Sequence, residues 1–93
     1  MIEKDIESKL RKYVEAMGGL ALKFVSPGYA GVPDRIVLMP GGKMAFCELK
    51  APGKVMRPLQ IKRKEKLESL GFRVYCIDDP EEIKGVIDEI QAT

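Results

Sequence analysis

The 93-residue sequence contains no histidine and no tryptophan, and its aromatic residues are only three tyrosines and three phenylalanines. Without histidine there is no histidine metal ligand and no serine or cysteine nucleophile that relies on a histidine base. Any bound metal must therefore be a hard cation held through oxygen. The few aromatics predict a modest core built from aliphatic side chains.

Cysteine is also scarce in this chain. Cys47 and Cys76 each stand alone in an apolar run, without the CxxC spacing of metal or redox sites. We predict two buried free thiols in a reducing compartment, with a disulfide as the less favoured alternative.

Long apolar runs are missing as well, so we expect no membrane span and no membrane partner. The segment from Met1 to Asp5 is charged at once and has no apolar region typical of a signal peptide. We expect a protein of the cytoplasm of a bacterium or of a phage-infected cell. Its length predicts one small domain over residues 1–93, for which a second copy would supply useful burial.

The spacing of the apolar residues predicts the order helix, three strands, helix, strand, helix, which is an α/β fold. Gly18 and Gly19 stop the first helix, the second begins near Pro58 and is ended by Gly71, and the third begins with Asp79 as its N-cap. The remaining ranges are residues 2–17 for the first helix and residues 20–25, 34–39, 43–50 and 72–77 for the strands. Ile83, Val86, Ile87 and Ile90 form the inward stripe of the third helix.

The second helix has a less regular pattern. Its leucines Leu59, Leu67 and Leu70 share one face, and Arg63 interrupts that face. Gln60 lies at its border in the first turn, where an amide can orient a water or contact a phosphate. The alternative for Gln60 is a plain capping or surface role, which its position alone favours.

Two short motifs carry the chemistry: Asp34 after a proline, and Glu48 with Lys50 two residues further on. The segment between them reads as a hairpin that turns at Gly41 and Gly42, so its two strands bring Asp34 beside Glu48. Because side chains alternate along a strand, Glu48 and Lys50 share one face. Two carboxylates and an amine then converge, which indicates a Mg²⁺ site for phosphodiester hydrolysis.

Each part of this constellation also has a simpler interpretation. Glu48 and Lys50 alone could form an ion pair on an exposed strand, and Asp34 alone could be a turn residue. The hairpin spacing that joins them favours the metal site. A third acid could come from the first helix, where Glu7 borders the apolar stripe and Glu3, one turn earlier, is the competing candidate.

A local excess of positive charge follows directly after the Glu48 to Lys50 motif. Residues 54–66 carry six cations and one acid, although the net charge of the whole chain is only +2. Lysines on a solvated helix face are common, but their place beside a hydrolytic site favours a track for the phosphate backbone of a nucleic acid. The predicted DNA-binding residues are Lys54, Arg57, Lys62 and Lys64.

The chain resembles the VRR-NUC domains (virus-type replication-repair nucleases) of the PD-(D/E)xK superfamily, which have a restriction-endonuclease-like core. The resemblance rests on Glu7, Gln60 and the segments 18–28, 31–35 (Gly-Val-Pro-Asp-Arg), 48–53 (Glu-Leu-Lys-Ala-Pro-Gly) and 70–75. It spans nearly the whole chain and implies a central mixed sheet flanked by helices in the order αβββαβα. It also implies that Glu7, Asp34, Glu48 and the Leu49 carbonyl bind Mg²⁺ or Mn²⁺, with Lys50 catalytic and Gln60 supporting the site.

The resemblance further implies a function. Small phage and prophage proteins of this type resemble Holliday-junction resolvases, which act as homodimers that make paired nicks in recombination and repair. We therefore expect a Mg²⁺- or Mn²⁺-dependent endodeoxyribonuclease for branched DNA, without an organic cofactor. The alternatives are a nuclease for flaps, nicked or single-stranded DNA, and a non-catalytic nucleic-acid-binding module on the same fold.

Overall fold

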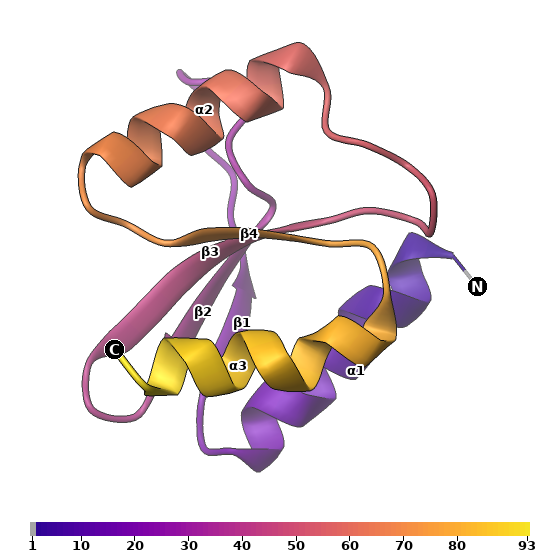
Figure 1. Ribbon diagram of the computed structural model, residues 1–93, viewed down its shortest axis with the longest axis vertical. Coiled ribbons are helices and arrows are strands. Elements are labelled where there is room, and N and C mark those ends of the chain that lie inside the picture. The colour runs from indigo at the N-terminus through magenta and orange to yellow at the C-terminus, as the bar shows by residue number, and fades with distance from the viewer. Residues whose placement is uncertain (1) are drawn as a thin grey trace.

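The computed structural model describes residues 2–93 as a four-stranded sheet between helices (Figure 1). The elements are α1 (Glu3–Ala16), β1 (Leu20–Lys23), β2 (Arg35–Met39), β3 (Lys43–Leu49), α2 (Pro58–Ser69), β4 (Val74–Ile77), the 3-10 turn η1 (Pro80–Glu82) and α3 (Ile83–Gln91). The predicted αβββαβα order is confirmed. The strands are one or two residues shorter than their predicted ranges.

The sheet is mixed, with strand order β1-β2-β3-β4. The first three strands pair antiparallel and β4 pairs parallel to β3, as the family resemblance implied. Gly41 and Gly42 turn the β2–β3 hairpin with φ angles of 85° and 75°, which other residues adopt at a cost. The resulting register places Arg35 opposite Cys47, so the preceding Asp34 comes beside Glu48.

One face of the sheet carries the hydrophobic core. Ala21, Val37 and Ala45 lie side by side on this face, and α1 and α3 cover it (Figure 1). The stripes that face it are fully or almost fully buried: Ile6, Leu10 and Val14 from α1, and Ile83, Ile87 and Ile90 from α3. Both stripes follow the predicted helical spacing.

The other face of the sheet carries α2, which packs chiefly against β4. The face that its leucines share is not a buried stripe, because Leu59 and Leu70 are exposed and Gln60 is the one buried residue of α2. A physical reason lies in the sequence: the cationic segment 62–66 separates Leu59 from Leu67, so no continuous apolar strip exists.

The two cysteines are free thiols, as predicted. Cys47 is buried, but Cys76 is only half-buried, so the prediction of two buried thiols holds for Cys47 alone. Cys47 lies opposite Tyr75 in the ladder, so Cys76 points to the opposite face of the sheet and cannot pair with it. Burial raises the pKa of Cys47 to about 12, which leaves it an unreactive thiol.

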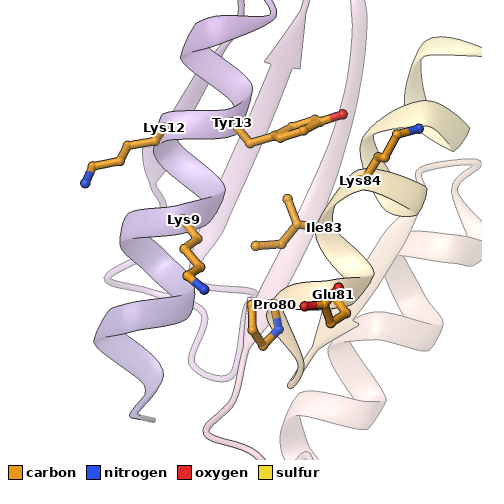
Figure 2. Close-up of a pocket in the computed structure, with 7 residues that line it drawn as sticks. All are labelled: Lys9, Lys12, Tyr13, Pro80, Glu81, Ile83 and Lys84. Atoms are coloured by element: carbon orange, nitrogen blue, oxygen red, sulfur yellow. The ribbon is translucent and has the colours of Figure 1, made fainter.

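A hollow of about 460 Å³ lies between α1 and the start of α3, remote from the sheet face that carries Asp34 (Figure 2). Three lysines line it, but Lys12 points away from it and Lys84 is paired with Asp88 at 2.8 Å. The three lysines therefore do not converge to form an anion-binding site. None of the helices within residues 2–93 combines the length and the apolar character needed to cross a bilayer.

Candidate active site

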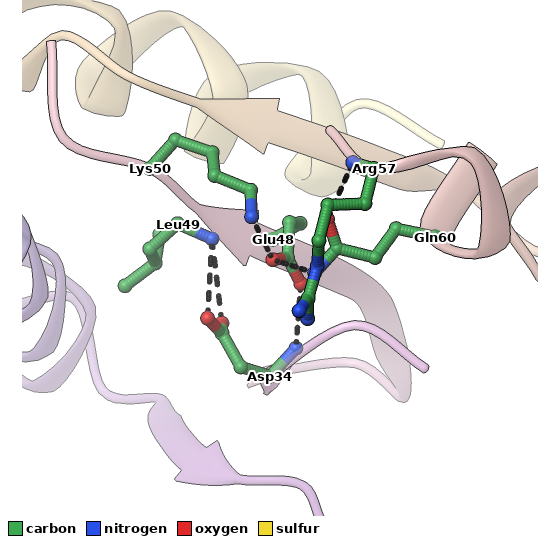
Figure 3. Close-up of polar contacts among 6 residues, drawn as sticks. All are labelled: Asp34, Glu48, Leu49, Lys50, Arg57 and Gln60. Atoms are coloured by element: carbon green, nitrogen blue, oxygen red, sulfur yellow. Dashed lines mark hydrogen bonds and ion pairs between the residues drawn. The ribbon is translucent and has the colours of Figure 1, made fainter. Parts of the chain in front are cut away.

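The two predicted carboxylates lie side by side on the face of the sheet that α2 shares (Figure 3). The backbone amide of Asp34 donates to Oε1 of Glu48 at 3.2 Å. The amide of Leu49 in turn donates to the two carboxylate oxygens of Asp34 at 3.3 and 3.4 Å. These reciprocal bonds hold both carboxylates in fixed positions at the point where β2 begins and β3 ends.

Gln60 fixes the second oxygen of Glu48. Its Nε2 donates to Oε2 of Glu48 at 2.8 Å, while its Oε1 accepts from the amide of Arg57 at 2.9 Å. The side chain therefore caps the helix and also contacts Glu48, whereas the sequence presented a capping role and a role at the site as alternatives. Since Gln60 is buried, this amide ties the first turn of α2 rigidly to β3.

Lys50 completes the predicted constellation. Its Nζ lies 3.2 Å from Oε2 of Glu48, and its side chain is largely buried. The ammonium group therefore stands beside one carboxylate of the pair, on the same face, as the alternation along β3 predicted. The simpler interpretation of the motif was an ion pair on an exposed strand, and this ion pair differs from it in being buried and in lying beside Asp34.

The charge of Asp34 is poorly compensated by its surroundings. Burial, and then the negative charge of Glu48, raise the pKa of Asp34 to about 7, against an ordinary value of 3.8. Glu3 also raises this pKa, whereas the Leu49 amide and Arg35 lower it. Two carboxylates this close together in a buried place repel each other, so a proton or a cation bound between them would be stabilising.

The structure separates the two candidates for the third acid. Glu7 Oε1 lies 2.7 Å from Nη2 of Arg35, whose side chain belongs to the face that α1 covers. Glu3 has its charge close enough to act on Asp34 and lines a hollow together with Lys50. Glu7 is thus not brought together with Asp34 and Glu48.

Two of the predicted DNA-binding residues lie next to the site. Lys54 and Arg57 line the same hollow as Lys50 and Glu3, a space of about 340 Å³. Lys62 is exposed on α2, whereas Lys64 is paired with Glu68 at 3.0 Å. The cations therefore continue from the carboxylate pair along α2. Lys64 is the one whose charge is already paired with an acid, Glu68.

Arg63 has a role that the sequence did not reveal. Its guanidinium stacks over the ring of Tyr29 at 3.8 Å, and its Nε donates to the Ala30 carbonyl at 2.7 Å. Gly31, with φ +86°, approaches so close to Leu59 that an added Cβ would lie 2.7 Å from its Cγ. Arg63 and Leu59 thus hold the loop that leads into Asp34 against α2.

The residues present fit a hard divalent cation. Mg²⁺ is commonly held by one or two carboxylates with water completing its shell, and Asp34 and Glu48 supply two carboxylates whose repulsion a cation would relieve. Across residues 2–93, no third acidic or thiol side chain joins them in a metal-binding cluster. A backbone carbonyl such as that of Leu49, and water, would have to supply the other ligands.

No protein-family model matches the chain. It is 48% identical over 77 residues to "Putative nuclease p44" of Acyrthosiphon pisum secondary endosymbiont phage 1, which covers 83% of this chain and 78% of that protein. A solved structure described as a VRR_NUC domain superposes with a TM-score of 0.85 at 26% identity, over 92% of this chain and 94% of the other. The chain belongs to the VRR-NUC family. It is a small α/β nuclease of that type, as its motifs predicted.

Proposed function

We propose that this VRR-NUC chain is a Mg²⁺- or Mn²⁺-dependent endodeoxyribonuclease that cuts branched DNA, above all four-way junctions, as a homodimer. The observation that carries the proposal is the pair of carboxylates, Asp34 and Glu48, held beside Lys50 on one sheet face. Two carboxylates can hold a divalent metal and an amine beside them can stabilise charge on a phosphate, so the set suits metal-assisted phosphodiester hydrolysis.

Asp34, Glu48 and the Leu49 carbonyl would hold the metal, which supplies charge neutralisation at the phosphate and acidifies a bound water when present. Lys50 orients the attacking water and stabilises the negative charge that develops on the phosphate oxygens. Gln60 keeps Glu48 in place through the bond from its Nε2. Hydrolysis adds one water across a P–O bond, so the products are one hydroxyl end and one phosphate end.

The third acid of the site comes from α1 in this proposal. The family resemblance assigns Glu7, which has to release Arg35 before it can reach a metal at Asp34. Glu3 is the competing candidate and needs no such change. Calorimetric Mn²⁺ titration of Glu7→Gln and Glu3→Gln separates them: weaker binding in Glu7→Gln alone supports Glu7, and weaker binding in Glu3→Gln alone refutes that assignment.

The basic residues on the same side of the molecule support DNA as the substrate. Lys54 and Arg57 lie beside Lys50, and Lys62 continues the track along α2 with Lys64. Contacts of this kind address the phosphate backbone and give affinity without reading bases. We propose the cytoplasm of a bacterium or phage-infected cell as its place of action, in recombination or repair.

The test is cleavage of a labelled four-way junction, a flap and a linear duplex of matched sequence, each with Mg²⁺, Mn²⁺ or EDTA. The proposal expects paired, symmetric nicks in the junction that require metal. Preferred cleavage of the flap or of the linear duplex would keep the active site and refute the junction assignment. Binding without cleavage under either metal would favour a non-catalytic module.

A further inference from the structure

The loop between β1 and β2 reaches from the sheet to α2, and its tip carries Tyr29 (Figure 1). Residues 27–30 at this tip are all exposed, and the neighbours of Tyr29 are Gly28 and Ala30, which are too small to cover its ring. A methyl group built on Gly28 would meet no atom within 4 Å, so the space beside the tip is open. An accessible aromatic side chain thus precedes Asp34 by five residues.

Arg63 holds this ring in place from α2. Its guanidinium lies 3.8 Å from the centroid of the Tyr29 ring, and its Nε donates to the Ala30 carbonyl at 2.7 Å. Tyr29 is nevertheless 40% exposed, and because the guanidinium covers one face of the ring, the exposed part is the other face and the edge. A ring that is already fixed loses little freedom when a second flat group stacks on it.

The same helix connects this ring with the carboxylate pair. Gln60 donates to Glu48 (Figure 3), and Arg63, three residues later, contacts Tyr29. Residues at this spacing lie about 5–6 Å apart between their Cβ atoms on one side of a helix. Since successive nucleotides of a strand are about 3.4 Å apart along its axis, a strand with a phosphate at Asp34 would bring a base to Tyr29 within about two or three nucleotides.

We infer that Tyr29, backed by Arg63, stacks on an unpaired base close to the cut phosphate and so favours branched or single-stranded DNA over intact duplex. Bases inside a duplex are covered on both faces by their neighbours, whereas a base at a branch point can leave the stack and offer a face. The inference deepens the proposed function, on which it rests for the position of the cut.

The charges around the ring favour a nucleic acid as its ligand. Lys62 is exposed beside Arg63 on α2, and Arg57 is exposed at the start of the same helix. An aromatic ring among cations matches a strand in which bases alternate with phosphates. Every base has a face that can stack, so this contact would add affinity without a sequence preference.

The experiment uses fluorescence at the ring itself. The chain has no tryptophan, so Tyr29→Trp introduces its sole indole, and Met17→Trp, 41% exposed at the end of α1, is the matched control. Each variant is titrated in EDTA, which prevents metal-dependent cleavage, with a thymidine oligonucleotide and with a sugar-phosphate strand of equal length that lacks bases. We expect the thymidine strand to quench Tyr29→Trp, the strand without bases to leave its emission unchanged, and Met17→Trp to respond to neither.

The affinity for the two strands is the second readout, measured by fluorescence anisotropy. Tyr29→Leu should bind the thymidine strand about 5- to 100-fold more weakly than wild type, the loss typical of one removed aromatic stack. It should bind the strand without bases as the wild type does, and Tyr29→Phe should keep the wild-type affinity for both. A tyrosine that only supports the loop would lower the affinity for both strands equally.

Emission of Tyr29→Trp that does not change with the thymidine strand, or that changes equally with both strands, would overturn the inference, and so would equal losses of affinity in Tyr29→Leu. Should Tyr29→Leu not fold by circular dichroism, Tyr29→Trp decides alone, because it keeps an aromatic ring over Arg63. Junction cleavage separates this from the proposed function. Base-dependent quenching in a protein that does not cleave refutes the function alone, whereas junction cleavage without such quenching refutes the role of Tyr29 alone.

Discussion

At the scale of single residues, the site depends on how each carboxylate is held. Glu48 accepts bonds from Asp34, Lys50 and Gln60, and thus has a donor for each oxygen. Among the described residues, Asp34 accepts from the Leu49 amide alone, and burial together with the charge of Glu48 raises its pKa in spite of that bond. The two acids therefore respond differently to substitution and to pH.

Gln60 is the first residue to test in this way. Gln60→Ala removes the donor to Glu48 and the acceptor for the Arg57 amide, so Glu48 loses its fixed position. Outer-shell changes of this kind typically cost about 10- to 100-fold in metal affinity or activity. We expect a loss of that size in junction cleavage and in Mn²⁺ affinity. Gln91→Ala, at the end of α3, is the control, and equal losses in both variants would contradict the role of Gln60.

The raised pKa of Asp34 predicts a pH dependence of stability. Between about pH 4 and pH 7 the folded protein keeps a proton on Asp34 that the unfolded chain releases. The free energy of unfolding should therefore fall as pH rises through this interval and level off above 7. Asp34→Asn should remove the decline and be more stable than wild type at pH 8. The chain has no histidine to titrate in the same interval.

Urea unfolding at pH 5, 6, 7 and 8 in EDTA measures this dependence. Glu65→Gln, an exposed acid on α2, is the matched control and should keep the slope of the wild type. A wild-type stability that rises from pH 5 to pH 8 would show that Asp34 is not desolvated as the structure has it.

At the scale of elements, the site is assembled where the loop before β2 meets α2. Arg63 stacks on Tyr29 and bonds to the Ala30 carbonyl, and Gly31 packs against Leu59. The same helix positions Gln60 against Glu48. Helix α2 therefore supports the loop that leads to Asp34 and contributes little to the hydrophobic core.

Gly31→Ala tests the contact between this loop and α2. The added methyl would lie 2.7 Å from Leu59, at a φ of +86° that alanine rarely adopts, so the loop has to shift. We expect a loss of about 1–3 kcal/mol in stability and reduced cleavage by the remaining folded protein. Gly28→Ala, in the same loop but with no atom within 4 Å of the added methyl, should leave both unchanged. Equal effects of the two would argue against docking of the loop on α2.

Sequence periodicity predicted most of these elements because local signals agreed with the fold. The hairpin glycines and the helix stripes each act within a few residues. So does the cap at Asp79, whose Oδ1 accepts from the Glu81 amide at 2.9 Å, although it caps the 3-10 turn η1 and α3 itself begins only at Ile83. The position of α2 was not predictable in this way, because its one buried residue is polar and its partner Glu48 lies 12 residues away. The pairing of Arg63 with Tyr29, and of Glu7 with Arg35, depends on contacts far apart in the chain.

At the scale of the whole molecule, the two faces of the sheet carry different kinds of side chain. Helices α1 and α3 lie on one side of the sheet and α2 on the other (Figure 1). The face under α1 and α3 holds the aliphatic core, and the other face holds the carboxylates, Lys50 and exposed apolar side chains of β1 and β2. A protein of 93 residues can build only a small core, and in this chain that core lies on one side of the sheet.

The placement of the cations predicts the salt dependence of DNA binding. Lys54→Glu with Lys62→Glu should weaken binding to all sequences alike and lower the slope of log affinity against log salt by about 2, one for each lost phosphate contact. Lys9→Glu with Lys12→Glu, on α1 across the sheet, is the matched control and should change the slope much less. Fluorescence anisotropy at several salt concentrations measures both. Equal slopes for the two double variants would show that DNA does not bind along Lys54 and Lys62.

The most direct test of the central claim compares wild type with Lys50→Ala in the cleavage of a labelled four-way junction, with Mg²⁺ and with EDTA. We predict metal-dependent cleavage by the wild type and a loss of about a hundred- to a thousandfold in Lys50→Ala, with binding of the junction retained. Lys9→Ala should cleave as the wild type does. Cleavage that persists in EDTA, or that is unchanged in Lys50→Ala, would contradict the account of Asp34, Glu48 and Lys50 as the hydrolytic site.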